Sequence, residues 1–247
     1  MTRFYLSTIG NDAVKTAQRY GFSLEIAEFC YAANLDEDYR RHQQACRQMM
    51  APFGECWFHA PFSELCPAAI DRKVRQITAQ RYTQAIRAAE DLGIHRVVIH
   101  GGFVPQVYFP EWFHSESVRF WKKFLASSPA GLVIALENVM EPDPRILRDI
   151  VEEVDDPRLG LCLDVGHANL TGVPLFQWLE ICAPRLVHFH IHNNDGKSDL
   201  HAPLPDGVIP MTDFLRQAIQ QTPNATFTVE TTSCERSAKF LQEASLL

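Results

Sequence analysis

The sequence predicts an α/β protein, a single (β/α)₈ TIM barrel spanning residues 1–247. Short apolar segments alternate with longer amphipathic segments eight times along the chain. The length of 247 residues and the apolar content of 46% suit one barrel of this class with a large core. Repeated strand–helix alternation implies parallel strands joined by right-handed crossovers, and eight such units close a barrel.

The expected strands are rich in Val, Ile, Leu and Phe, as strands buried on both faces should be. They cover residues 3–9, 23–29, 56–59, 96–100, 132–137, 159–164, 185–192 and 226–230. The expected helices cover residues 11–20, 36–50, 70–92, 112–126, 143–154, 174–182, 211–221 and 235–245. An open doubly wound sheet is the competing fold, but no Gly-x-Gly-x-x-Gly turn follows the first strand.

Composition and charge narrow the class of protein. The net charge is -7 and no block of Lys or Arg occurs, so nothing favours a surface that binds polyanions. No basic start with a long apolar run indicates a signal peptide, and no stretch of about 18 apolar residues indicates a membrane span. The seven cysteines form no Cys-x-x-Cys pair, which is typical of reduced thiols. We therefore expect a cytoplasmic protein with no membrane partner.

A His or a carboxylate residue stands at the end of each strand from the third to the eighth. These residues are His59, His100, Glu137, Asp164, His190 and Glu230, and His167, Asp199 and His201 follow in adjoining loops. The C-terminal strand ends of a barrel meet at one mouth, so these side chains should converge. One such residue is ordinarily a packed core group, but unpaired buried carboxylates are costly, and six in succession favour a metal. The set predicts a site for one to three divalent ions, Zn²⁺ or Mn²⁺.

The seventh strand carries three histidines that need separate treatment. His188, His190 and His192 alternate, so they point to the same face of the strand. Each step of two residues moves a side chain about 7 Å along the strand, so the three cannot all reach one ion. We expect His190 to be the ligand, His188 a deeper core group and His192 a group at the rim or against substrate.

These motifs together resemble a known superfamily. The segments are His59-Ala-Pro, His100-Gly-Gly, Leu-Glu137-Asn, Asp164-Val-Gly-His167, His190-Ile-His, Asp199-Leu-His201 and Val-Glu230-Thr. They resemble the xylose isomerase-like TIM barrels, which include sugar isomerases, sugar epimerases and abasic-site nucleases of the endonuclease IV type. The resemblance runs from the third strand to the eighth. It is specific for the superfamily and says little about the reaction.

The resemblance implies roles for individual residues. In the sugar epimerases one ion is held by four residues, whose positions match Glu137, Asp164, His190 and Glu230, and the two glutamates also serve as acid and base. In the nuclease nine residues hold three zinc ions. The matching positions here are His59, His100, Glu137, Asp164, His167, His190, Asp199, His201 and Glu230. The ligand set alone therefore leaves both reactions open.

Our first hypothesis is a metal-dependent isomerase or epimerase of a sugar or related hydroxy-carbonyl compound. It would act by proton transfer through a metal-stabilised enediolate, with Glu137 and Glu230 as the acid–base pair and His167 against a substrate oxygen or a second ion. The alternative is a zinc-dependent abasic-site nuclease, or another metal-dependent hydrolase or lyase. The loops after the third and seventh strands are acidic, so we expect a small sugar-like partner and no nucleic acid. The chain could form a homodimer.

Two sets of residues are assigned only in part. Aromatic side chains could wall the pocket, since sugar faces pack on aromatic rings. They are Trp57, Phe62, Phe103, Tyr108 and Trp112, and core packing explains each of them equally well. Of Glu25 and Glu28 on the second strand, we expect one to line the mouth and the other to be ion-paired or at the surface.

Overall fold

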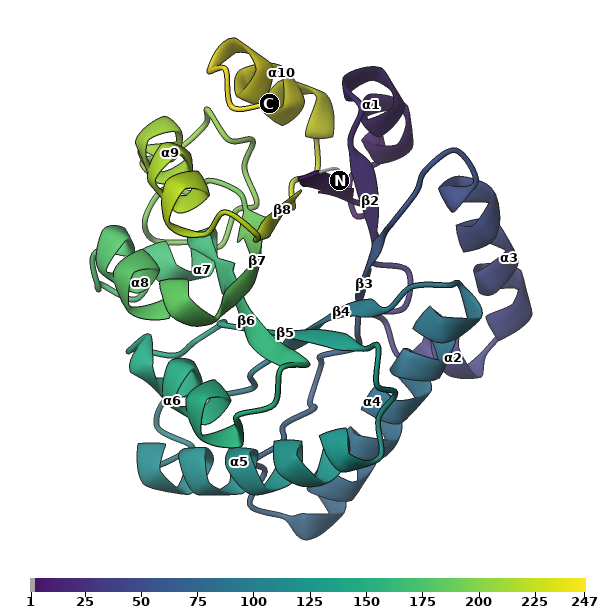
Figure 1. The fold of residues 1–247 in the computed structure, drawn as a ribbon, viewed down its shortest axis with the longest axis vertical. Coiled ribbons are helices and arrows are strands. Elements are labelled where there is room, and N and C mark those ends of the chain that lie inside the picture. Colours follow the sequence, from purple (N-terminus) through teal and green to yellow (C-terminus); the bar gives the residue numbers. More distant parts are fainter. Residues whose placement is uncertain (1–2) are drawn as a thin grey trace.

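The computed structural model describes residues 3–247, which form a closed barrel of eight parallel strands surrounded by helices (Figure 1). Each strand pairs with the next in the sequence, and β8 closes the barrel on β1, with Phe4 opposite Phe227. The strands are β1 (Phe4–Ser7), β2 (Ser23–Ile26), β3 (Trp57–His59), β4 (Arg96–His100), β5 (Val133–Glu137), β6 (Leu159–Asp164), β7 (Leu186–Ile191) and β8 (Thr226–Val229). The predicted fold class is confirmed.

The helices form a ring outside the strands (Figure 1). They are α1 (Ala13–Tyr20), α2 (Ala33–Asp36), α3 (Tyr39–Met50), α4 (Arg72–Asp91), α5 (Pro110–Ala126), α6 (Arg145–Val154), α7 (Val165–Asn169), α8 (Leu175–Cys182), the 3₁₀ turn η1 (Ala183–Arg185), α9 (Met211–Gln221) and α10 (Cys234–Glu243). The last helix lies beside the first, where Glu235 pairs with Arg19 at 2.6 Å. Within residues 3–247, no helix has the length and apolar character needed to cross a bilayer.

Several predicted boundaries are wrong for local reasons. The second strand ends at Ile26 instead of residue 29, because the Ala27 amide donates to the Thr8 hydroxyl and the Cys30 amide donates to the Ala27 carbonyl. The predicted helix 36–50 is divided between α2 and α3, and Asp38 lies between them with φ of 48°. That left-handed residue turns the chain between the two helices.

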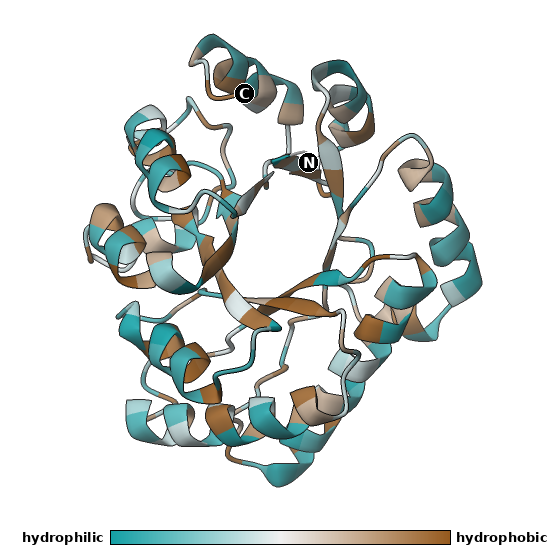
Figure 2. Ribbon diagram, viewed as in Figure 1, coloured by the Kyte–Doolittle hydropathy of each residue, from teal (hydrophilic) through white to brown (hydrophobic). Residues whose placement is uncertain are grey.

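The core has two apolar layers, one outside the strands and one inside the barrel. Figure 2 shows apolar strands and helices whose hydrophilic surfaces face outward. Buried side chains such as Phe58, Phe227 and Trp121 fill the space between strands and helices. Inside the barrel, farther from its C-terminal mouth, a second cluster consists of Tyr5, Trp57, Val98, Ala135 and Cys162. The interior of the barrel is therefore packed, as in other barrels of this class.

The period of two along each strand places the polar residues directly above that inner cluster. In β3 to β6 an inward apolar residue is followed two positions later by a candidate ligand. The pairs are Trp57 and His59, Val98 and His100, Ala135 and Glu137, and Cys162 and Asp164. Residues two apart on a strand share a face. The apolar layer therefore supports a polar layer at the C-terminal mouth.

Candidate metal centre

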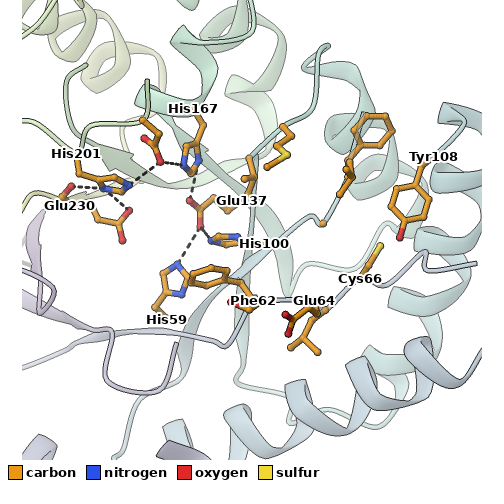
Figure 3. A pocket seen from close by; sticks show the side chains of 18 residues that line it. His59, Phe62, Glu64, Cys66, His100, Tyr108, Glu137, His167, His201 and Glu230 are labelled. Atoms are coloured by element: carbon orange, nitrogen blue, oxygen red, sulfur yellow. Dashed lines mark hydrogen bonds and ion pairs between the residues drawn. The ribbon is translucent and has the colours of Figure 1, made fainter. Parts of the chain in front are cut away.

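A cavity of about 460 Å³ opens at the C-terminal mouth of the barrel. Seven of the nine predicted ligands line it, namely His59, His100, Glu137, His167, Asp199, His201 and Glu230 (Figure 3). The other two, Asp164 and His190, are fully buried. The structure thus brings all nine residues together around one site, and their role as ligands stays a prediction.

The described residues form four overlapping groups whose donor atoms lie within 4.8 Å of one another, and three of these groups contain the nine residues and His192, while the fourth joins Glu25 to His59, His190 and Glu230. The first group contains His59, His100 and Glu137. The central quartet contains Glu137, Asp164, His190 and Glu230. The loop group contains His167, His192, Asp199 and His201. Glu137 belongs to two of the groups, so the groups adjoin one another.

In the first group, one carboxylate oxygen faces two imidazoles. Oε2 of Glu137 lies 3.4 Å from Nε2 of His59 and 3.2 Å from Nε2 of His100. This oxygen is buried and has no aligned hydrogen bond. Donor atoms around one tetrahedral ion with bonds of about 2.1 Å are about 3.4 Å apart, which is the spacing found here. A cation between these three side chains would satisfy the buried oxygen.

Backbone carbonyls orient three of the histidines. Nδ1 of His59, His167 and His201 lies 2.9 Å from the carbonyl oxygens of Ala60, Asn138 and Glu230, respectively. A carbonyl only accepts, so Nδ1 must carry the proton, and in the neutral ring Nε2 keeps its lone pair. Metal-binding histidines are commonly held by a hydrogen bond of this kind.

The central quartet is built around His190. Its Nδ1 lies 3.2 Å from Oε1 of Glu137, 3.2 Å from Oε2 of Glu230 and 4.0 Å from Oδ2 of Asp164. The opposite nitrogen, Nε2, lies 2.9 Å from Oε1 of Glu25. His190 therefore presents one nitrogen to the candidate ligands and the other to Glu25, in an ion pair whose two atoms, Nε2 and Oε1, have no aligned hydrogen bond.

Glu25 is the side chain whose role the sequence left undecided. It is fully buried, and its Oε2 accepts from the Thr228 hydroxyl at 2.6 Å and lies 3.1 Å from Nε2 of His188. His188 stacks on Trp57 with ring centroids 4.0 Å apart, so it is the deep core group that we predicted. Glu28 is the ion-paired residue, since its carboxylate meets Nδ1 of His42 at 2.5 Å. Inward alternation on β2 was the one signal that could have distinguished the two glutamates.

The loop group corrects the prediction for His192. This side chain is buried and does not lie at the rim, because the loop after β7 folds back over it. Its Nε2 lies 3.1 Å from Oδ1 of Asp164, and its ring stacks on His201 at 4.1 Å. Only glycine fits at position 166, where a Cβ would lie 1.9 Å from the His192 ring. His192 therefore joins the candidate ligands.

Two asparagines and one short helix hold the loop group in place. The Asn193 side chain donates to the Leu204 carbonyl at 2.8 Å and accepts from the Ile209 amide at 3.0 Å, so it ties the ends of the loop together. The Asn138 side chain bridges β5 to β6 through the amide and carbonyl of Asp164. The Asp164 carboxylate accepts from the His167 amide at 2.7 Å and begins α7, a helix that the sequence pattern did not predict.

Opposite charges balance one another inside this site. Burial alone would raise the pKa of Glu137, but His190 and His100 outweigh burial and hold it well below its ordinary value. Burial would lower the pKa of His190, but the neighbouring Cys162, Glu25 and Glu137 raise it well above 6.5. The pKa of His100 is instead lowered, because burial outweighs the nearby Glu137 carboxylate there. A divalent cation would supply the same positive charge, so the donor set fits a metal such as zinc or manganese.

Of the five aromatic side chains that could wall the pocket, three line the cavity. Phe62, Phe103 and Tyr108 contribute to its surface. Trp57 does not, because it is fully buried below His188 in the barrel interior. Trp112 does not either, because its indole nitrogen is turned to donate to the Ala68 carbonyl at 3.0 Å.

Comparison with known families agrees with this geometry. Residues 14–247 match the family described as xylose isomerase-like TIM barrel, so the chain belongs to that family. A D-tagatose 3-epimerase-like protein has the same fold, with a TM-score of 0.83 and 22% identity over 99% of this chain and 97% of that one. A Thermus thermophilus protein soaked with zinc chloride is 27% identical, with a TM-score of 0.75 and the same coverage.

Two relatives in sequence are of different kinds. An uncharacterised protein of Methanocaldococcus jannaschii is 31% identical over 170 residues, which are 64% of this chain and 58% of that protein. A probable endonuclease 4 of Mycobacterium ulcerans is 25% identical over 182 residues, which are 68% of this chain and 70% of that protein. The chain thus matches just over half the length of the first relative. The chain is thus similar in fold to an epimerase-like protein and similar over part of its sequence to a probable endonuclease 4.

A buried carboxyl beside the site gives a test of these electrostatics. Oε2 of Glu141 accepts from the Val139 amide at 2.6 Å, and Oε1 is buried without a hydrogen bond. Burial raises the pKa of Glu141 from 4.5 to about 7. Between those two pH values the folded protein keeps a proton that the unfolded chain loses, so the stability of the wild type falls as the pH rises through this window.

We therefore expect the free energy of unfolding of Glu141→Gln, relative to that of the wild type, to increase progressively between pH 5 and pH 8. The relative gain should be on the order of 2–3 kcal/mol, because the amide has no proton to lose. Urea unfolding of metal-free protein at both pH values measures it. Glu180→Gln, on an exposed carboxyl, is the matched control. A constant difference between Glu141→Gln and wild type across this range would contradict the assignment.

Proposed function

We propose that this protein is a metal-dependent isomerase or epimerase of a sugar or related hydroxy-carbonyl compound. The observation that carries the proposal is that Glu137 and Glu230, two members of the central quartet, both line one cavity at the barrel mouth. Isomerisation and epimerisation need a base for a weakly acidic proton on the carbon next to a carbonyl. Two carboxylates at one cavity provide a base and, after protonation, an acid.

The protonation states of the two glutamates suit this role. His190 lies 3.2 Å from each carboxylate and outweighs burial, so it holds the pKa of Glu137 and of Glu230 below its ordinary value. Both side chains are then ionised at neutral pH and able to take a proton. His167 lines the same cavity and would contact a substrate oxygen or a second ion. A bound divalent ion would supply positive charge that favours a developing oxyanion.

Glu137 and Glu230 would divide the proton transfer between them. One carboxylate takes the proton from the carbon next to the carbonyl and leaves an enediolate. Returning a proton to the former carbonyl carbon, while the hydroxyl proton moves to the former carbonyl oxygen, isomerises the substrate, and returning a proton to the opposite face of the original carbon epimerises it.

Abasic-site nuclease activity is the second candidate function. The nine-residue set and the similarity to a probable endonuclease 4 support it. One observation weighs against it. Among residues 3–247, no Lys or Arg side chain lines the cavity, although phosphates are bound mainly by such cations.

We predict that Glu137→Gln and Glu230→Gln each slow proton exchange by about 10²- to 10⁴-fold, since an amide is a poor base of nearly the same shape. The measurement is deuterium incorporation by NMR, in D₂O with added Zn²⁺ or Mn²⁺, across a panel of ketoses, aldoses and inososes. Glu90→Gln, on the exposed surface of α4, is the control and should exchange at the wild-type rate. Exchange at that rate in either site variant would exclude it as the acid or base.

We also predict that the protein does not incise abasic DNA. The reason is that, among the described residues, acidic, apolar and histidine side chains line the cavity, and no Lys or Arg is there to bind the phosphates on either side of a flipped nucleotide. The assay uses a duplex with one abasic site and protein reconstituted with zinc, because stripped protein would give a trivial negative. Efficient incision under those conditions would make the nuclease the assigned function.

A further inference from the structure

The cavity has an apolar arm that the proposed proton transfer does not use. The loops after β3, β4 and β5 supply its walls, which include Phe62, Leu65, Phe103, Val104, Val139 and Met140. Figure 3 shows Cys66 and Tyr108 at the end of the cavity far from His201 and Glu230. A molecule held at the candidate ligands therefore has a second, apolar compartment beside it.

Phe62 joins this arm to the candidate ligands. Its ring stacks on His100, with centroids 4.3 Å apart and an angle of 15°, and meets His59 edge-on at 5.7 Å. If a molecule is bound at the polar end of the cavity, a substituent that extends from it into the arm therefore lies against an aromatic face. Aromatic rings pair favourably with such a face in offset or edge-on geometry.

Exposed apolar side chains from three separate loops converge on this arm. The exposed fractions are 38% for Phe62, 40% for Val104 and 54% for Met140. Phe103 behind them is buried and packs edge-on against Phe113 at 5.1 Å, so the wall has a fixed backing. Exposed apolar groups that gather at a concave site beside polar groups are typical of ligand contact.

The charges of the arm disfavour an anionic substituent. Over the part of the chain that the structure describes, the lining contains no Lys or Arg. Glu64 is the charged side chain of the arm and is acidic, and it holds a left-handed backbone with φ of 60°. A phosphate or carboxylate placed in the arm would find no cation and would meet a like charge.

We propose that the substrate is an uncharged hydroxy-carbonyl compound with an apolar, flat substituent, such as an aromatic ring, that occupies this arm. The inference rests on the proposed function for the polar end of the molecule. The apolar end follows independently from the walls of the arm. Sugar phosphates and carboxylated cyclic ketones fall outside this class.

Three α-hydroxy ketones that differ only in one substituent test the inference. They are hydroxyacetone with a methyl group, dihydroxyacetone with a hydroxymethyl group and 2-hydroxyacetophenone with a phenyl group. Relaxation of the ligand protons by Mn²⁺-loaded protein gives a Kd for each. We expect the phenyl compound to bind at least about tenfold more tightly than the other two, because transfer of its ring from water into the apolar arm is favourable.

Matched variants locate the effect in the arm. Val104→Asp and Met140→Lys should each remove most of the preference for phenyl and leave hydroxyacetone binding unchanged. Val74→Asp is the control, since Val74 is 38% exposed on α4 and does not line the cavity. Equal binding of all three ketones, or a phenyl preference that survives both arm variants, would overturn the inference while leaving the proposed function intact. Failure of all three to bind would overturn both.

Discussion

The constraint on which the rest of the structure depends is the burial of several carboxylates in the mouth of one barrel. Glu25, Glu137, Asp164 and Glu230 are all buried, and a carboxylate oxygen of each lies 2.9–3.2 Å from an imidazole nitrogen of His190 or His192. Ionised groups are costly to bury unless positive charge lies beside them. The histidines of the site supply that charge, and a divalent cation would supply it more compactly.

Sequence patterns predicted the fold and the set of converging residues for a geometric reason. Alternation of strand and helix defines parallel strands, and the C-terminal ends of parallel strands in a closed barrel meet at one place. A residue at a strand end is therefore located without knowledge of any contact. This reasoning was sufficient for His59, His100 and Glu137, each of which is the last residue of its strand.

Features that depend on loop closure or on depth could not be predicted in this way. His192 was expected at the rim, and its burial follows from the fold of the loop after β7, which Asn193 fastens. Alternation could separate Glu25 from Glu28, but it could not show that β2 ends at Ile26 and leaves Glu28 beyond the strand, because a contact between Ala27 and Thr8 sets that end. Trp57 shares its face with His59, but it lies one layer deeper and packs in the interior. Period and spacing define a face; depth is set by the register between strands.

The central claim is that the central quartet of Glu137, Asp164, His190 and Glu230 holds a divalent metal ion. Anomalous diffraction at the zinc edge, from crystals of protein reconstituted with zinc, tests it most directly. We predict an anomalous-difference peak at the central quartet, with donor atoms of these four side chains about 2.0–2.2 Å away. No peak at the quartet, with His190 still ion-paired to Glu137 and Glu230 in the presence of zinc, would contradict it.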